Sequence, residues 1–155
     1  MAELTPGDDA PRFSLPADGG GKVRLTDLRG KIVVLFFYPQ DDTETCTAEA
    51  IDFSRLDAEF KEAGAVVIGV SPDSPKKHEK FKSKHGLAMP LVADEAREAI
   101  EAYGVWAEKT MFGRKYMGVV RSTFLIDRAG KIAAIWRKVR VPDHANEVLA
   151  AAKRL

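Results

Sequence analysis

The chain has 155 residues, a formal net charge of +1 and one cysteine. This length predicts one domain over residues 1–155, and a single cysteine excludes an internal disulfide and does not argue for secretion. No apolar run approaches the roughly 20 residues of a membrane span, the acidic N-terminus is not a signal peptide, and acidic and basic residues are interspersed. We therefore expect a cytoplasmic protein that binds neither a membrane nor nucleic acid.

The first half of the chain predicts a strand–helix–strand unit. Residues 13–16 and 23–25 flank three glycines, which indicates an N-terminal hairpin. The apolar run 32–37 predicts a buried strand. One helix is expected after it, running to about Ala63 with Gly64 as its end, and residues 65–70 predict a second core strand.

The second half predicts shorter elements. Ser74 and Pro75 form a good helix start, and the lysine-rich helix that follows to residue 85 reads as a solvated face, including His78 and His85. A short strand over 90–93 is expected next.

Further along, Asp94 should cap a helix through Tyr103, and residues 111–115 should form an irregular loop. Residues 121–127 and 131–136 predict a β-hairpin, and a last helix should start at residue 142 or 143. This order favours an α/β thioredoxin-like fold, a mixed central β-sheet flanked by helices with an N-terminal β-hairpin.

The cysteine, Cys46, falls where the first core strand hands over to a helix. Free backbone N–H groups and the positive end of the helix dipole favour a thiolate there. A lone cysteine can equally be a small buried hydrophobic residue. No histidine or cysteine set at ligand spacing accompanies the acids Asp41 and Asp42, so neither a metal nor a cofactor is expected.

The residues around Cys46 resemble those of a known family. Pro39, Thr43 and Cys46 match the peroxiredoxin signature P-x-x-x-T-x-x-C, and residues 113–127 look like the family segment that carries an active-site arginine. Residues 136–139 and His144 also match. Over nearly the whole chain the sequence resembles a peroxiredoxin of the bacterioferritin-comigratory, PrxQ-like group.

The resemblance implies a thiol-dependent peroxidase that reduces hydrogen peroxide and organic hydroperoxides through a cysteine sulfenic acid. Cys46 would be the peroxidatic cysteine, Thr43 would hydrogen-bond the thiolate and the peroxide, and Pro39 would shield the site. Arg121 would stabilise the thiolate and the transition state, and Glu49 would orient Arg121. Apart from the resemblance, the backbone N–H groups around Thr45 and Cys46 at the helix start are expected to stabilise the same charge.

Two positions depart from the family pattern. Glu44 and Thr45 replace the usual Pro-Gly, and we expect Glu44 to point to solvent because an inward carboxylate would disfavour the thiolate. Ile51 stands where many PrxQ proteins carry a resolving cysteine. The resemblance therefore implies a one-cysteine mechanism completed by an external thiol, such as thioredoxin, glutaredoxin or glutathione, in a monomer or weak homodimer.

Other interpretations remain open at this point. The chain could be a thioredoxin-fold binding or holdase module without catalysis, and thiol loss with stoichiometric peroxide separates the two. Thr43 or Thr45 can serve as a helix cap, and Glu49 as a first-turn acid. Trp106 and Phe112 can line the pocket or pack in the core, and His144 reads as structural.

Overall fold

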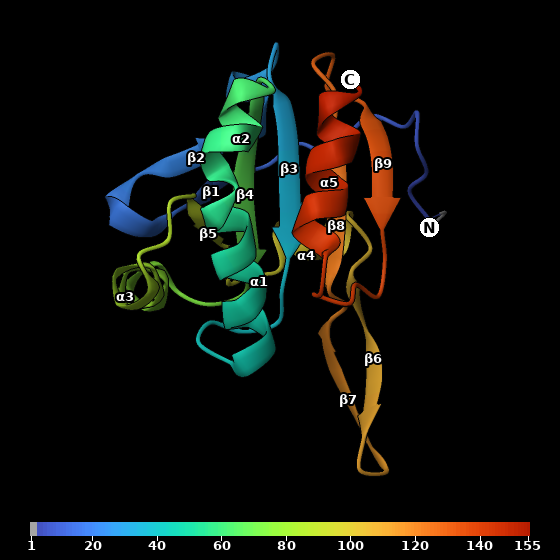
Figure 1. Ribbon diagram of the computed structural model, residues 1–155. Helices are drawn as coiled ribbons and strands as arrows, with labels where there is room; N and C mark the ends of the chain where they lie inside the picture. Colours follow the sequence, from blue (N-terminus) through green and yellow to red (C-terminus); the bar gives the residue numbers. More distant parts are fainter. Residues whose placement is uncertain (1–2) are drawn as a thin grey trace.

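A five-stranded mixed sheet forms the centre of the protein, with strand order β5-β4-β3-β8-β9. The computed structural model describes residues 3–155 (Figure 1). β3 pairs in parallel with β4 and antiparallel with β8; β4–β5 is parallel and β8–β9 antiparallel. The strands of this sheet are β3 (Ile32–Phe37), β4 (Ala65–Ser71), β5 (Leu91–Ala93), β8 (Ser122–Ile126) and β9 (Ile132–Trp136).

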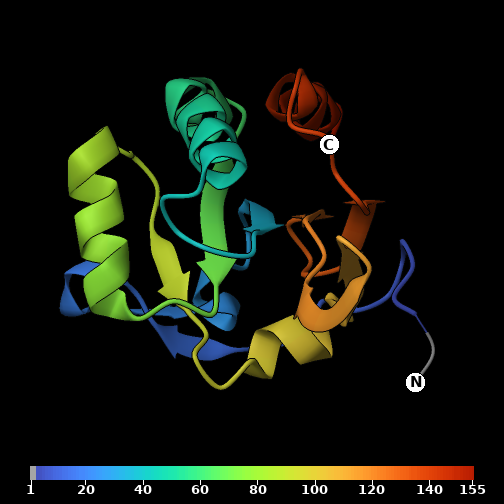
Figure 2. The same cartoon turned by 90° about the horizontal axis from the view of Figure 1, so that it is seen from below.

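Helices cover both faces of the sheet. Seen from below, α1, α2 and α5 lie on one side of the strands, whereas α4 and the β1–β2 hairpin lie on the other (Figure 2). The helices are α1 (Glu44–Arg55), α2 (Asp57–Glu62), α3 (Pro75–His85), α4 (Glu98–Ala102) and α5 (His144–Lys153), with 3-10 turns at Asp18–Gly20 and Leu25–Leu28. The small hairpin joins β1 (Ser14–Pro16) to β2 (Lys22–Arg24).

The alternation of side chains along β3 explains this two-sided core. Successive residues of a strand point to opposite faces, and all six residues of β3 are buried. Val34 and Phe36 belong to the cluster that includes Phe53 of α1, whereas Leu35 and Phe37 belong to the cluster on the other face. A continuous apolar run is what a strand covered on both faces requires.

The thioredoxin-like α/β fold expected from the sequence is confirmed. One helix was expected through Ala63, but the chain forms two helices that meet at Leu56, whose φ of −96° and ψ of 2° leave the regular helical values. Asp94 does accept from the N–H groups of Glu98 and Ile100, yet α4 starts only at Glu98 because Arg97 is left-handed, with φ of 60°.

Residues 111–115 were expected to form an irregular loop, and this was wrong. They lie at the tip of a regular antiparallel hairpin of β6 (Trp106–Met111) and β7 (Arg114–Val119). The hairpin extends well beyond the body of the protein (Figure 1). Its strands are mostly exposed, so they lack the apolar pattern by which a strand is usually recognised.

The strand register brings distant residues to one edge of the sheet. Phe37, the last residue of β3, pairs with Ser122, the first residue of β8. Arg121 therefore lies immediately across from Tyr38, and α1 begins a few residues further along the chain. The carboxyl ends of parallel strands are the usual ligand-binding edge of such sheets.

Candidate active site

Cys46 sits in the first turn of α1. Thr43 occupies the N-cap position, and the first helical hydrogen bond runs from the N–H of Thr47 to the carbonyl of Thr43. The N–H groups of Glu44, Thr45 and Cys46 therefore precede the helical ladder and have no intrahelical acceptor. They place partial positive charge at the helix start, where a negative sulfur is favoured.

Arg121 joins the sulfur to a buried carboxyl group. Its Nη2 donates to Cys46 Sγ at 3.3 Å, and its Nη1 donates to Glu49 Oε1 at 2.6 Å. The Arg121 side chain is 13% exposed and that of Glu49 is 1% exposed. The planar guanidinium has several donors in fixed directions, so one side chain can hold both partners at once.

The electrostatics of this cluster depend on its burial. Burial raises the pKa of Glu49 to about 7, against the opposing charge and hydrogen bond of Arg121. Burial also lowers the pKa of Arg121, but the charges of Glu49 and Cys46 outweigh this and raise it overall. Glu49 Oε2 has no hydrogen-bond partner among the described residues. Near neutral pH, Glu49 thus exchanges between an acid and a carboxylate while Arg121 stays charged.

The other expected site residues surround this cluster less closely. Pro39 is half-buried, and Thr43, Glu44 and Thr45 are exposed, so Glu44 faces solvent as expected. The hydroxyl of Thr43 donates to the Gln40 carbonyl at 3.2 Å. The expected hydrogen bond from the Thr43 hydroxyl to Cys46 Sγ is not among the hydrogen bonds of residues 3–155.

The side chains of Phe112, Trp106 and His144 differ in their surroundings. Phe112 is 99% exposed, so the expectation that it lines the pocket or packs in the core was wrong. Trp106 is half-buried beneath the guanidinium of Arg97, 4.5 Å from the ring centroid. His144 is buried with its Nε2 2.8 Å from Thr123 Oγ1, and burial together with Arg121 lowers its pKa to about 4.

A buried polar network under the loop before Cys46 was missed by the sequence analysis. His78 was expected to be solvated, but its side chain is fully buried. Its Nδ1 lies 2.6 Å from Asp41 Oδ2 and its Nε2 lies 2.9 Å from the Val92 carbonyl. The hydroxyl of Tyr38 donates to Asp41 Oδ1 at 2.6 Å, so two buried side chains, Tyr38 and His78, hold the Asp41 carboxylate.

The acceptor atoms of this network determine which atoms carry its protons. A carbonyl oxygen can only accept, so His78 Nε2 must carry a proton, and one further proton lies between His78 Nδ1 and Asp41. The N–H of Asp41 donates to Asp73 at 2.7 Å, and the hydroxyl of Ser71 donates to the same Asp73 oxygen at 2.8 Å.

The burial of His78 could have been recognised from its spacing in the sequence. Position 78 lies one helical turn before the buried Phe81, so the two side chains share one face of the helix.

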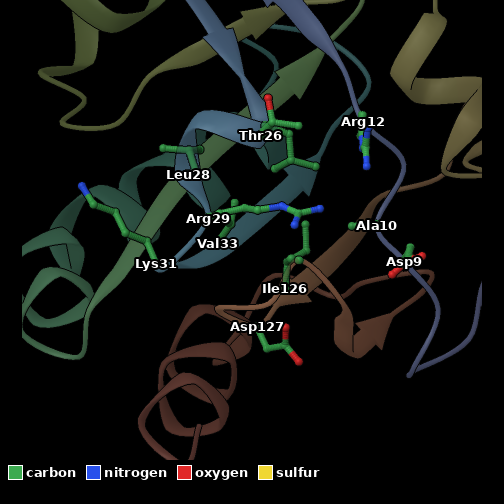
Figure 3. Close-up of a pocket in the computed structure, with 12 residues that line it drawn as sticks. Asp9, Ala10, Arg12, Thr26, Leu28, Arg29, Lys31, Val33, Ile126 and Asp127 are labelled. Carbon is green, nitrogen blue, oxygen red and sulfur yellow. The ribbon is translucent and has the colours of Figure 1, made fainter.

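A separate pocket lies at the opposite edge of the sheet. Its volume is about 130 Å³, and Arg12, Arg29 and Asp127 are among its lining residues (Figure 3). It adjoins the first residues of β3 rather than its last, and its lining includes none of the expected site residues. Within residues 3–155, no group of three or more His, Cys, Asp or Glu side chains is arranged to hold a metal ion.

Comparison with known proteins identifies the family of the chain. The family model described as the AhpC/TSA family matches residues 6–135. The chain belongs to the AhpC/TSA family. Peroxiredoxin Bcp of Bacillus subtilis is 50% identical over 147 residues, which cover 95% of this chain and 94% of that protein.

Solved structures agree with this assignment. A Xylella fastidiosa PrxQ mutant superposes with a TM-score of 0.94 at 37% identity, covering 99% of this chain and 98% of the other. The Xanthomonas campestris bacterioferritin comigratory protein, from work on its alkyl peroxide reduction activity, gives a TM-score of 0.87 at 43% identity over 92% of this chain and 90% of the other.

This AhpC/TSA protein is thus a peroxiredoxin of the Bcp, PrxQ-like group and a thiol-dependent hydroperoxide reductase. It is a one-cysteine form, because Cys46 is its single cysteine. Ile51, at the place expected for a resolving cysteine, is 42% exposed on α1.

Proposed function

We propose that Cys46 attacks the peroxide and that Arg121 stabilises the charge that moves during this attack. The thiolate sulfur bonds to the terminal oxygen of the hydroperoxide, the O–O bond breaks, and the departing alkoxide or hydroxide takes up a proton. Sulfur is oxidised by two electrons to the sulfenic acid, and the peroxide is reduced to an alcohol or water. The contact between Arg121 Nη2 and Cys46 Sγ at 3.3 Å is the observation that carries this proposal.

A lowered pKa of the Cys46 thiol would by itself accelerate peroxide reduction only slightly. Lowering the pKa of a thiol from about 8.5 to about 6 raises its thiolate fraction at pH 7 roughly 30-fold. Nucleophilicity falls roughly tenfold over the same change, with a Brønsted slope of about 0.45 taken from disulfide exchange. The net gain is only a few-fold, so stabilisation of the transition state must supply the rest.

Arg121 and the helix start are positioned for that task. Fixed donors aimed at developing charge contribute about 3–4 kcal/mol each in other enzymes. Arg121 is one such donor, and the free N–H groups of Thr45 and Cys46 are two more. Glu49 orients Arg121 through their 2.6 Å contact, Pro39 shields the sulfur from water, and Thr43 turns its hydroxyl from Gln40 toward the bound peroxide.

An external thiol completes the cycle. It attacks the sulfenic acid with release of water, and a second thiol reduces the mixed disulfide to restore Cys46. Cys46 is only 1% exposed, so this step requires the first turn of α1 to open. No side-chain hydrogen bond caps the turn at Thr43, and an uncapped helix end opens at low free-energy cost.

We further propose that alkyl hydroperoxides are substrates along with hydrogen peroxide. Thioredoxin, glutaredoxin or glutathione is the proposed reductant. The protein is proposed to act in the cytoplasm as a monomer or weak homodimer. The single cysteine supports both an outside reductant and a reducing compartment. A one-cysteine site needs no partner cysteine on a second chain, so it functions within a monomer.

The test is steady-state consumption of hydrogen peroxide and of an alkyl hydroperoxide with each of the three reductants. Turnover is expected with at least one of them, and Cys46→Ser should abolish it. The matched control is Ile51→Ser, which changes an exposed residue of the same helix and should keep turnover near the wild-type level. Peroxide consumption that persists in Cys46→Ser would overturn the proposal.

A further inference from the structure

The tip of the β6–β7 hairpin exposes an unusual amount of apolar surface. Phe112 is 99% exposed, Met111 54%, Met117 51% and Tyr116 42%. These four are a majority of the large hydrophobic side chains exposed on the described part of the chain, and they fall within seven consecutive residues. The hairpin carries them away from the body of the protein (Figure 1). We call residues 111–117 the hairpin tip.

The backbone of the hairpin tip is strained at Phe112. Phe112 and Gly113 form the two-residue connection between β6 and β7, with φ of 52° and 77°. Such turns strongly prefer Asn-Gly or Asp-Gly, because a left-handed conformation suits short polar residues and glycine. A bulky aromatic residue there is an outlier. Its ring is almost wholly solvent-exposed, so packing within this chain does not offset the strain, and a binding role outside the chain is indicated.

The charge of the hairpin identifies the kind of surface that it fits. Lys109, Arg114 and Lys115 are cationic, and Glu108 is the only acid between Trp106 and Val119. Glu108 lies 3.7 Å from Lys115 with both side chains largely exposed, so this pair contributes little. Exposed aromatic and aliphatic side chains flanked by basic ones are the composition of peripheral segments that bind anionic lipid surfaces.

The distribution of the apolar side chains favours lipid over a protein partner. The pairing of Met111 with Arg114 and of Lys109 with Tyr116 places Met111 and Tyr116 on one face of the ribbon. Met117, paired with Glu108, lies on the opposite face. A protein surface would cover one face of the ribbon, whereas a lipid surface surrounds an inserted tip on all sides.

We propose that the hairpin tip docks the protein on anionic lipid surfaces, with Phe112 inserted among the acyl chains and the basic residues at the headgroups. None of the helices within residues 3–155 is long and apolar enough to cross a membrane, and surface docking requires no such helix. The absence of a membrane partner was predicted from the lack of a long apolar run, and binding at a lipid surface does not require such a run. This proposal is independent of the peroxidase mechanism.

Docking would bring the reactive sulfur toward lipid. The base of the hairpin adjoins the site, since Trp106 of β6 pairs with Val119, two residues before Arg121.

The test is co-sedimentation of the full-length protein with vesicles of phosphatidylcholine alone or mixed with phosphatidylglycerol. Binding is expected to the mixed vesicles and to weaken as salt is raised. Phe112→Asn should bind at least tenfold more weakly, because burial of a phenylalanine ring is worth a partition factor of about ten or more. Phe112→Leu keeps an apolar tip and should bind within a few-fold of wild type.

Phe112→Asn is also its own folding control. Asparagine suits the left-handed position, so the melting temperature should be equal to or higher than that of wild type. Its oxidation by hydrogen peroxide in solution should be unchanged, because residue 112 lies outside the Cys46 cluster. Wild-type protein that binds neither kind of vesicle would overturn the proposal and leave a protein partner as the occupant. Equal vesicle binding by wild type and Phe112→Asn would overturn it as well.

Discussion

The Nη2 atom of Arg121 lies 3.3 Å from the Sγ atom of Cys46, although the two residues are 75 positions apart in the chain. The pairing of Phe37 with Ser122 creates this contact, because it sets the start of β8 beside the loop that leads into α1. The same guanidinium holds Glu49 on the next turn of α1. The contact therefore depends on the sheet register and on the helix together.

Replacing Arg121 should slow peroxide reduction more than it slows a simple alkylation. For Arg121→Ala we expect the rate constant of Cys46 oxidation by hydrogen peroxide to fall about 10²–10³-fold, the usual loss for one fixed donor. Alkylation by iodoacetamide reports only the reactive thiolate and should fall much less. Stopped-flow oxidation and alkylation, measured at the same pH, give the two ratios.

A control is needed because Arg121→Ala leaves Glu49 buried without its ion-pair partner. The double variant Arg121→Ala/Glu49→Gln removes that unpaired charge and should recover stability but not the peroxide rate. Equal losses in oxidation and alkylation would mean that Arg121 acts only on the ionisation of the thiol.

Glu49→Gln should change how stability depends on pH. The pKa of Glu49 is raised on folding from 4.5 to about 7. A carboxyl group with a raised pKa stabilises the folded state below its unfolded value, and this stabilisation is lost as pH rises through the folded value. Wild type should therefore lose free energy of unfolding between about pH 4.5 and pH 7, by an amount on the order of 3 kcal/mol.

Glutamine has no such titration, while its amide oxygen still accepts from Arg121. Urea unfolding of wild type and Glu49→Gln at pH 5 and pH 8 measures the difference. The variant should gain stability relative to wild type at pH 8 compared with pH 5. Parallel pH profiles for the two proteins would contradict a titrating Glu49.

Asp41→Asn and Asp41→Ala should differ sharply, since His78 and Tyr38 hold the side chain at position 41. Asparagine can accept from Tyr38 and donate to neutral His78, which preserves both hydrogen bonds. Alanine leaves His78 and Tyr38 buried without their partner, at a cost of about 1–3 kcal/mol for each group. Urea denaturation and stopped-flow oxidation are the measurements.

We expect Asp41→Asn to keep stability and peroxide rate within a few-fold of wild type, and Asp41→Ala to lose both. His78→Phe should behave like Asp41→Ala. If Asp41→Asn proved as defective as Asp41→Ala, the network would act through charge rather than by positioning the loop that carries Pro39 and Thr43.

Cys46 should discriminate between reagents by size. The residue is 1% exposed, so a bulky aromatic disulfide such as 5,5′-dithiobis(2-nitrobenzoic acid) must wait for the first turn of α1 to open. We expect this disulfide to react more slowly with Cys46 than with free cysteine. Hydrogen peroxide should react faster with Cys46 than with free cysteine. The two rates, compared with free cysteine under the same conditions, test this. Acceleration by both reagents would indicate an open thiol.

The sequence predicted the core well because its strands are apolar runs bounded by glycine and proline. β3 and β4 fall within a residue of their expected bounds, since each is buried on both faces. The β6–β7 hairpin could not be recognised this way, because its strands bury little and its turn carries Phe112 instead of asparagine. That residues 1–155 form one domain stays a prediction.

The site was predicted from resemblance more than from pattern. The apolar run 32–37 and the helical pattern after it placed Cys46 at a helix start, but nothing in the local sequence links that position to Arg121. That link requires the β3–β8 register, a long-range feature. The burial of His78 was missed because lysines on both sides suggested a solvated helix, although its spacing from Phe81 places both on one face.

The most direct test of the central claim is the intact mass of the protein after mixing with one equivalent of hydrogen peroxide at neutral pH, with dimedone present to trap the product. Oxidation at Cys46 through a sulfenic acid predicts one dimedone adduct per chain, formed within seconds and absent from Cys46→Ser. An unmodified thiol over the time that free cysteine needs to react would contradict the account.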